Sequence, residues 1–576
     1  MHRYPEAEAL ERHLGDPNDP ERPLSFARSC RLDEAEAAPE ESYAALDAWG
    51  FNAWYVPGRW GGRLDDAAAA LALLRVVQRR DVTVAHQYGN CLLGGLPVWI
   101  SGSDRQKRAM AERLLRGERV AFALSERAHG GDIVGSETSA RAVPGGYVLT
   151  GEKWPISQAT RATALSVLAR TGKAGPRGFS WFYVEKDQLA PDRFGHLERS
   201  RTLGLRGADI SGIRFHECFV PRDALAGVLG EGMETALRGL LLSKAMVATL
   251  PLGATDTALR VTTEFAETRR VLGARVADIP HARTTLAGAF VDLLVADCVA
   301  TVGARSFNIV PEQASLHGNV VKAFVPGVCK RALHDIAGIL GARFYLRDEP
   351  ASGIFQKMLR DTAIVDVFDG STLVCLNAIG SQLAVRASRL AGGACDGGAV
   401  ERARLLFSAS PVPPLEPDRV ALYGKGRDDV VDVLPHLLAE TERAGAATAV
   451  IEALRRAREE MARWPAELDA IREGYGPSAG RSAALYEVAE EYCVVYALCA
   501  CVGLWLMRRE DADSFFARGD WVVEAARRLG ERLGGAARRT DPPRDTTGAV
   551  FEELCRRARD AEMFSVVPVA LGRRGR

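Results

Sequence analysis

The sequence predicts an α+β protein in which a small antiparallel β domain lies between two helical domains, with a further helical domain appended. The spacing of apolar residues changes twice along the chain, and this carries the prediction. Apolar residues recur every three or four positions up to about residue 117 and again from Gly230. Between them, residues 119–222 hold short β-branched or aromatic runs separated by turn signals such as Pro144-Gly145-Gly146. At 576 residues the chain is also too long for one core.

The same signals set the boundaries of each part. In the first helical part, the segment RQKRAMAERLL follows Ser103 and Asp104, either of which suits the N-cap of a helix. A Gly- and Pro-rich stretch, AGGACDGGA and then SASPVPPLEPD, predicts a linker. In chain order we expect an N-terminal helical domain (1–118), a middle β domain (119–225), a helical-bundle domain (226–390), the linker (391–418) and an appended helical domain (419–576).

Composition and charge exclude several classes of protein. Lys plus Arg balance Asp plus Glu, 74 against 74, so no net charge draws the chain toward nucleic acid. The polar, acidic N-terminus is unlike a signal peptide and the eleven cysteines show no paired spacing, which together predict a cytoplasmic protein. The longest apolar stretch, 494–507, is too short to cross a bilayer, so we expect no membrane span. The histidines are dispersed, so we expect no metal site.

One acidic residue stands out in the segment VDVFDGSTLV (365–374). Asp369 ends an otherwise apolar run and precedes a Gly-Ser-Thr turn. It fits two interpretations. The carboxylate is either a turn residue that caps the next helix, or a base whose proton affinity is raised by apolar surroundings.

Six blocks of sequence bear on the choice between these two interpretations of Asp369. They are YVPGRWGGRL (55–64), AFALSERAHGGDIVGSETSARAVPGGYVLTGEKWPIS (121–157), LGLRGADISGIRFHECFVP (203–221), TRRVLGARVADIP (268–280), GILGARF (338–344) and KMLRDTAIVDVFDGST (357–372). In this order they resemble the acyl-CoA dehydrogenase family over about residues 35–390. The resemblance implies a helical domain, a β barrel-like domain and a four-helix bundle, with FAD held between them.

The resemblance also implies a reaction and a base. Asp369 stands where the family has the Glu that removes the α-proton of an acyl thioester while a hydride leaves the β-carbon for the flavin. Phe368, Gly370 and Lys244 would then lie against the substrate, and a backbone N–H of the turn would polarise the thioester carbonyl. Asp is one methylene shorter than Glu, and a misplacement of about 1 Å can slow a reaction on the order of a hundredfold. On the earlier helix where some members place the base, this chain has Ser243, so Asp369 is the inherited candidate; a purely structural turn remains the alternative.

The resemblance implies a set of FAD-binding residues, and this sequence departs from the family pattern at some of these positions. The residues expected to bind FAD are Ser125, Gly131, Trp154, Ser157, Arg269, Gly341 and Ser371. Among them, Arg269 matches an arginine that reaches the FAD phosphates of a neighbouring subunit. Pro155 replaces the tryptophan that stacks on the flavin, with Trp154 one residue earlier. Gly130-Gly131-Asp132 lacks the family serine that helps to hold the CoA part, so an acyl-carrier-protein substrate is an alternative to acyl-CoA.

The last domain and the acceptor complete the set of expectations. The helical extension resembles that of the very-long-chain branch and implies a homodimer; a docking domain is the alternative. The family implies an electron-transfer flavoprotein as acceptor. Two other functions stay open: a flavin-dependent monooxygenase or oxidase that uses oxygen, and a nucleic-acid-associated or non-catalytic member of the superfamily.

Overall fold

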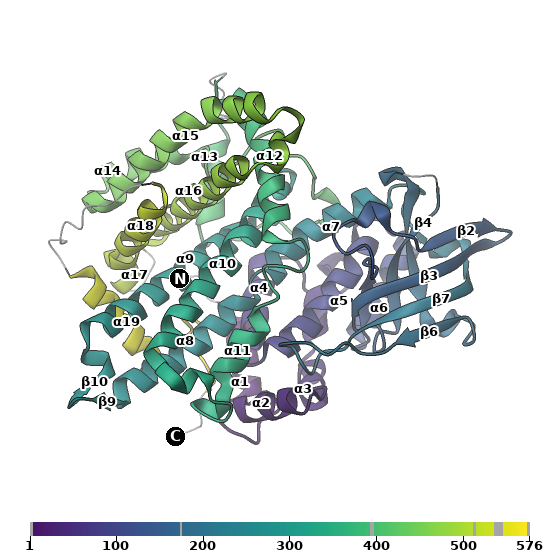
Figure 1. The fold of residues 1–576 in the computed structure, drawn as a ribbon, viewed down its shortest axis with the longest axis horizontal. Helices are drawn as coiled ribbons and strands as arrows, with labels where there is room; N and C mark the ends of the chain where they lie inside the picture. Colours follow the sequence, from purple (N-terminus) through teal and green to yellow (C-terminus); the bar gives the residue numbers. More distant parts are fainter. Residues whose placement is uncertain (1–3, 173–174, 392–396, 511–513, 535–544, 573–576) are drawn as a thin grey trace.

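The computed structural model describes residues 4–172, 175–391, 397–510, 514–534 and 545–572. The β domain projects from one end of the molecule, and helices make up the remainder (Figure 1). Helices of the N-terminal part lie against the helical bundle, and the appended helices cover another side of that bundle (Figure 1).

The N-terminal part consists of six α-helices. They are α1 (Pro5–Leu14), α2 (Phe26–Glu34), α3 (Glu40–Trp49), α4 (Ala67–Gln78), α5 (Val82–Ser101) and α6 (Asp104–Leu115). Ser103 is the N-cap of α6: its side chain accepts from Gln106 N, and the Gln106 side chain accepts from Ser103 N in return. Gly94 of α5 faces the β domain, because a Cβ there would lie 2.5 Å from the carbonyl oxygen of Val120. This close approach lets α5 pass directly beneath strand β1.

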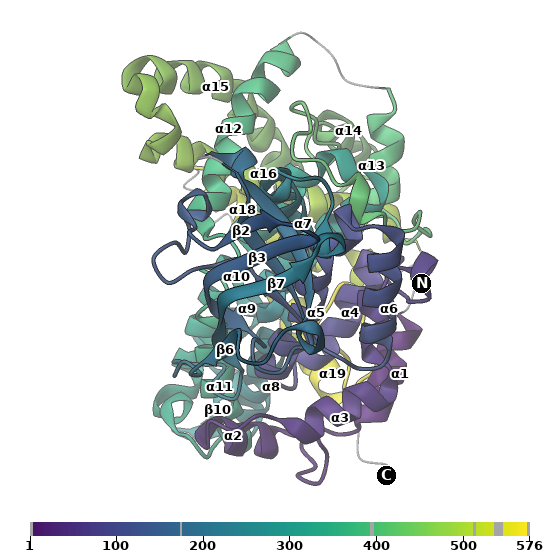
Figure 2. The ribbon, with the colours of Figure 1, turned by 90° about the vertical axis from the view of Figure 1, so that its right-hand side faces the viewer.

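The middle part is a mixed sheet. Its strands are β1 (Val120–Ala123), β2 (Ser139–Val143), β3 (Gly146–Ser157), β4 (Ala164–Arg170), β5 (Phe179–Glu185), β6 (Phe194–Leu197), β7 (Ile210–Pro221) and β8 (Leu225–Ala226). The order is β6-β7-β3-β2-β4-β5-β8, with β1 paired to β4, and Figure 2 shows β3 and β7 side by side. The expected antiparallel arrangement needs one correction: β1 and β2 both pair with β4 in parallel.

The bundle that follows contains six helices and a short hairpin. The helices are α7 (Gly232–Val247), α8 (Leu250–Thr268), α9 (Pro280–Ile309), α10 (Ala314–Leu340), α11 (Ile354–Thr362) and α12 (Thr372–Ala391). Strands β9 (Arg270–Val271) and β10 (Ala274–Arg275) form an exposed hairpin after α8. Helix α10 packs against α7, α8, α9 and α12, so it is the central helix of the bundle.

In its described residues the appended part has seven helices, and one of them lies in the expected linker. They are α13 (Ala399–Phe407), α14 (Leu434–Arg443), α15 (Thr448–Tyr475), α16 (Ala483–Arg508), α17 (Ser514–Arg518), α18 (Asp520–Arg532) and α19 (Thr546–Arg559). The prediction of a linker over 391–418 is wrong where α13 forms, because Ala399, Ala403, Leu406 and Phe407 are buried at helical spacing. Residues 392–396 of that range lie outside the described residues.

Within the described residues, three helical stretches are long and apolar enough to cross a membrane by length and composition. They are Gly232–Thr268, Pro280–Ile309 and Ala483–Arg508, and 83%, 89% and 89% of their most apolar windows are buried inside the protein. Their apolar side chains therefore already have protein partners. The expectation that no segment spans a membrane stays a prediction.

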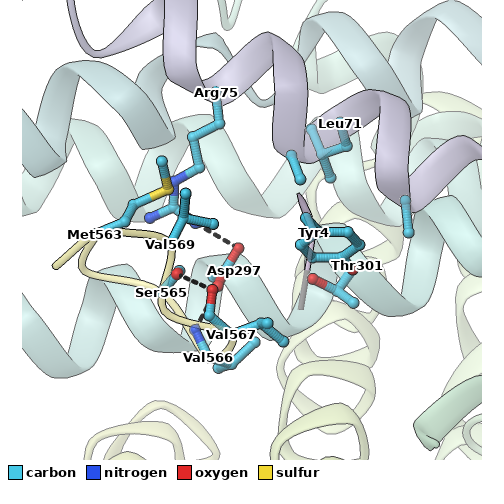
Figure 3. Close-up of a pocket in the computed structure, with 12 residues that line it drawn as sticks. Tyr4, Leu71, Arg75, Asp297, Thr301, Met563, Ser565, Val566, Val567 and Val569 are labelled. Atoms are coloured by element: carbon cyan, nitrogen blue, oxygen red, sulfur yellow. Dashed lines mark hydrogen bonds and ion pairs between the residues drawn. The ribbon is translucent and has the colours of Figure 1, made fainter. Parts of the chain in front are cut away.

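The C-terminal segment, residues 560–572, runs back across the bundle to the N-terminal helices. Figure 3 shows it beside a cavity of about 20 Å³, roughly the room that one water needs. There the buried Asp297 binds Arg75 at 2.6 Å and accepts from Val566 N at 2.7 Å. This buried ion pair fastens the end of the chain to α4 and α9.

We expect Asp297→Asn to lower the free energy of unfolding by about 3 kcal/mol or more, because it leaves the buried Arg75 guanidinium without its counter-charge. The matched control is Asp418→Asn, which removes an exposed pair with Arg59 at 3.4 Å and is expected to change stability by at most about 1 kcal/mol. Denaturant unfolding of both variants measures the difference. Equal losses would contradict the role given to Asp297.

Candidate active site

The turn between α11 and α12 presents Asp369 in an unusual backbone conformation. Asp369 has φ 56° and Gly370 has φ 87°, and Asp is among the few side chains that tolerate the left-handed region. Ser371 Oγ, not Asp369, accepts from the first turn of α12, at Val374 N and 3.4 Å. The Asp369 side chain points instead to α7. The interpretation of Asp369 as a helix cap is therefore wrong.

Asp369 is held by the helix on which some family members carry the base. Ser243 Oγ of α7 donates to Asp369 Oδ2 at 2.5 Å. The two alternative positions for a base thus meet in space, although 126 residues separate them in the chain. A hydroxyl in that place orients the carboxylate.

Two lysines face this carboxylate without forming an ion pair with it in the described part of the chain. Lys322 of α10 is fully buried; its Nζ donates to the carbonyl oxygen of Val365 at 2.5 Å and lies 4.7 Å from the centre of the Phe368 ring. Lys244 is 8% exposed, donates to Asn319 Oδ1 at 2.9 Å, and lies against Gly370. Desolvation raises the pKa of Asp369, while Lys322, the Ser243 hydrogen bond and Lys244 each oppose this rise.

The backbone of the same turn supplies unused donors. Within the described residues, the N–H groups of Asp369, Gly370 and Ser371 donate no hydrogen bond. They precede the first turn of α12, where the helix dipole adds a positive partial charge. Such a group of N–H donors suits an oxygen that gains negative charge.

Helix α5 forms the opposite wall with two polar residues. His86 Nε2 lies 3.1 Å from Ser157 Oγ and 3.3 Å from Asn90 Nδ2, and its ring centre lies 5.6 Å from that of Phe368. Because the Asn90 amide nitrogen is a donor, Nε2 is the accepting nitrogen of a neutral ring. Burial lowers the pKa of His86 to about 4, which keeps the ring neutral near pH 7.

A buried ion pair orders the strand ends that hold Ser125 and Trp154. Lys153 Nζ donates to Glu126 Oε1 at 2.8 Å and to the Leu124 carbonyl at 2.9 Å, on both sides of Ser125. Trp154 N donates to the Ser125 carbonyl at 3.0 Å. Desolvation lowers the pKa of Lys153 to about 8. The charge of Lys153 and hydrogen bonds from residues 137 and 138 lower the pKa of Glu126 to about 2. Both side chains therefore stay charged near pH 7.

The Trp154 ring already has neighbours within the chain. The Arg127 guanidinium carbon lies 4.1 Å from the centre of the Trp154 ring. The Trp154 Nε1 donates to Ser200 Oγ at 3.2 Å. Pro155, at the place of the family's stacking tryptophan, is exposed. That Trp154 stacks on a flavin stays a prediction.

The structure brings most of the expected site residues to one junction between the β domain and the bundle. Ser157 contacts His86, and His86 in turn contacts Phe368, which belongs to the turn that carries Asp369. Ser125 and Trp154 are bonded to each other on the same edge of the β domain. Three expected residues lie apart: Gly131 in an exposed loop, Arg269 at the exposed hairpin, and Gly341 at the end of α10.

Sequence reasoning missed three residues of this junction: His86, Asn90 and Lys322. The signal for Lys322 was a single charged residue within the apolar run NVVKAFV, at a position where helical spacing predicts burial. His86 and Asn90 are four residues apart on a helix that is buried nearly all round, and nothing in the sequence showed which side meets the site. Among the described residues there is no group of His, Cys, Asp and Glu that could hold a metal ion.

Comparisons with known proteins relate two parts of the chain to one family. Residues 121–218 match the model of the acyl-CoA dehydrogenase middle domain, and residues 230–384 match that of the acyl-CoA dehydrogenase C-terminal domain. A probable acyl-CoA dehydrogenase, fadE25 of Mycobacterium leprae, is 26% identical over 345 residues, which cover 60% of this chain and 87% of that protein.

Two solved structures share the fold. An acyl-CoA dehydrogenase of Bacillus anthracis complexed with FAD has a TM-score of 0.67 at 18% identity and covers 96% of this chain and 92% of its own. The prolyl acyl carrier protein oxidase AnaB has a TM-score of 0.57 at 19% identity and covers 63% of this chain and 96% of its own. The first match extends through the appended helices, so these also belong to a known architecture.

The lowered pKa of His86 predicts a pH dependence of stability that tests how the site is packed. A histidine that is neutral when folded and can take a proton when unfolded destabilises the protein as the pH falls from about 6.5 to about 4. The full effect is about 3 kcal/mol. We expect His86→Gln to remove this part of the pH dependence.

The measurement is the unfolding midpoint in denaturant at several values between pH 7 and pH 4. The exposed His281→Gln is the control and should follow the wild-type profile. A His86→Gln profile parallel to that of the wild type would contradict the burial of a neutral ring.

Proposed function

We propose that the chain is an FAD-dependent acyl-thioester dehydrogenase that makes a 2,3-unsaturated product, because residues 121–218 and 230–384 match the models of the acyl-CoA dehydrogenase middle and C-terminal domains. The observation that carries this proposal is the desolvated Asp369 carboxylate, oriented by Ser243 beside three unused backbone N–H donors. A base and an oxyanion site next to each other are what α-proton removal from a thioester requires.

The residues at the junction fit the expected cofactor. Ser125, Ser157, Trp154 and Ser371 are half-buried, so each retains surface that a ligand can contact, and hydroxyls suit the polar edge of a flavin. Val367, Leu373 and Val374, beside Asp369, are 59%, 59% and 53% exposed, which leaves apolar surface for a ring or an acyl chain to cover. FAD, when bound, supplies the acceptor for the hydride from the β-carbon.

The remaining cofactor residues support an assembly. Arg269 is exposed on the β9–β10 hairpin, away from the site of its own chain, and a guanidinium there suits the phosphates of a second subunit. Gly131 and Gly341 are both exposed, and each leaves open space for a neighbouring group. These observations support the proposal of a homodimer in which each hairpin completes the partner's cofactor site.

The chain's own groups perform the proton step. Asp369 takes the α-proton, and the N–H groups of the turn stabilise the negative charge that develops on the thioester oxygen. Lys244 beside Gly370 adds positive charge near the same oxygen. Because the pKa of Asp369 is raised, the base form is lost as the pH falls through a value above the ordinary one for aspartate.

The loop at 130–132 departs from the family pattern in the region that would hold the thioester carrier. Gly130, Gly131 and Asp132 are exposed and lack the hydroxyl that family members use for the CoA part. An acyl-carrier-protein substrate needs no nucleotide pocket, and one relative in fold is an oxidase of a prolyl acyl carrier protein. We therefore propose a carrier-protein thioester as the first substrate to test and acyl-CoA as the second. We also propose an electron-transfer flavoprotein or oxygen as the electron acceptor, a cytoplasmic location and no nucleic-acid partner.

Anaerobic mixing of the yellow, FAD-loaded protein with acyl-carrier and acyl-CoA thioesters tests the proposal. Bleaching of the flavin absorbance is expected with at least one thioester, and Asp369→Asn should slow it by at least about a hundredfold. The thioester that bleaches fastest identifies the carrier. Flavin that no saturated thioester reduces would overturn the proposal and favour the oxygen-dependent alternative.

The contact between Ser243 and Asp369 predicts a rescue. Exchanging the two residues, in Ser243→Asp with Asp369→Ser, keeps one carboxylate and one hydroxyl within hydrogen-bond distance of each other. We expect this double variant to reduce its flavin at least about tenfold faster than Asp369→Ser alone, since the base returns to nearly the same place. Stopped-flow absorbance measures both rates. A double variant no faster than Asp369→Ser would contradict the equivalence of the two positions.

A further inference from the structure

Lys322 contacts both ends of the turn that carries Asp369. Its Nζ donates to the Val365 carbonyl at 2.5 Å, four residues before Asp369, and lies 4.7 Å from the centre of the adjoining Phe368 ring. No atom of its side chain reaches solvent, since Lys322 is 0% exposed. An ammonium is seldom fully buried unless nearby groups stabilise its charge.

The buried lysines near the turn lie close to Asp369 without forming an ion pair with it among the described residues. In the part of the chain that the structure describes, neither Lys322 nor Lys244 forms an ion pair with any carboxylate. Their hydrogen-bond acceptors are neutral: the Val365 carbonyl and Asn319 Oδ1. Asp369 is the carboxylate whose charge most supports that of Lys322, and Lys322 is the cation that most supports the charge of Asp369.

The other groups that face Asp369 contribute less charge. Ser243 on α7 is neutral, and burial raises the pKa of the Cys375 thiol on α12, which keeps it neutral. His86 on α5 contacts Phe368 and is neutral because burial lowers its pKa to about 4. Asp366 of the same turn pairs with Lys330 at 3.1 Å at the surface. The two buried lysines are therefore the cations that oppose desolvation at Asp369.

We propose that Lys322, with Lys244 as a second cation, is a positioning residue that braces the 365–369 turn against α10 and keeps Asp369 in its charged, proton-accepting form. This rests on the proposed function for its consequence in catalysis. The geometric part, a buried lysine that donates to the Val365 carbonyl and lies over the Phe368 ring, holds whatever the reaction. The arrangement also accounts for a base that lacks a salt bridge: a direct ion pair would hold the carboxylate away from the substrate, whereas a cation behind the turn supports its charge and leaves it free.

The coupling is measured first on the protein without substrate. Because the folded pKa of Asp369 is raised, the wild type loses stability relative to Asp369→Asn as the pH rises from the ordinary aspartate pKa of the unfolded chain to the folded pKa. The difference levels off at the folded pKa, so the midpoint of this levelling-off step reports the folded pKa. We expect Lys322→Met to move the midpoint up by about one pH unit or more, because an opposite charge nearby shifts a carboxyl pKa by that amount. Lys244→Met should move it up by less.

The matched control is Lys330→Met, on the same helix and beside the same turn but half-exposed. Its midpoint should equal that of the wild type. If Lys322→Met does not fold, Lys244→Met decides, and a wild-type midpoint in Lys244→Met then overturns the proposal. A wild-type midpoint in a folded Lys322→Met overturns it as well.

The second readout is the pH dependence of single-turnover flavin reduction. The acid limb should shift upward in Lys322→Met by the same amount as the midpoint from unfolding, which a merely structural role would not produce. Failure of every thioester to reduce the wild-type flavin would overturn the proposed function while the stability readout still tests the coupling. An acid limb that stays in place while the rate falls would overturn the catalytic part of the proposal.

Discussion

A carboxylate without a salt bridge in a desolvated site constrains the structure around it. Removing an ionised group from water costs free energy, and here the Ser243 hydroxyl and the two lysines Lys322 and Lys244 oppose that cost. Ser243 and Lys244 come from α7 and Lys322 comes from α10, so the site exists only when α7, α10 and the turn before α12 are packed together. The bundle is thus the frame that makes a chemically reactive aspartate stable.

The appended helices reach this frame through α10 and α12. Helix α12 starts at Thr372, directly after the turn, and packs on α10, α15 and α16. At the same boundary, the buried His317 of α10 bonds Tyr496 of α16 at 2.7 Å, while Tyr492 donates to Asp428. Buried polar contacts of this kind have few alternative arrangements, so they set the register between the two helical parts. The appended domain therefore packs against the helix that carries Lys322.

Much of this could be read from the sequence, and the exceptions have physical causes. The change of apolar period located the sheet, and the Ser103 N-cap was one of two residues that the sequence allowed. The parallel pairing of β1 with β4 and the helix α13 within the expected linker were not predictable, because tertiary packing decides both.

In the site, the resemblance to the acyl-CoA dehydrogenase family pointed to Asp369 and to the serines expected near it. It could not show that Lys322, 47 positions earlier, faces the same turn, or that Ser243 would orient the carboxylate. Those contacts arise from helices that cross in space, and a sequence records only the apolar spacing of each helix by itself. Asp in place of Glu was visible at once; the left-handed backbone that suits Asp there was not.

The claim that Asp369 removes an α-proton is tested most directly by hydrogen exchange. The FAD-loaded protein is incubated in D₂O with an acyl thioester whose β-carbon is replaced by sulfur, which can lose an α-proton but no hydride. Mass spectrometry of the recovered thioester then counts the exchanged positions. The account predicts deuterium at the α-carbon with the wild type and almost none with Asp369→Asn. Equal exchange by both proteins would contradict the assignment of Asp369 as the base.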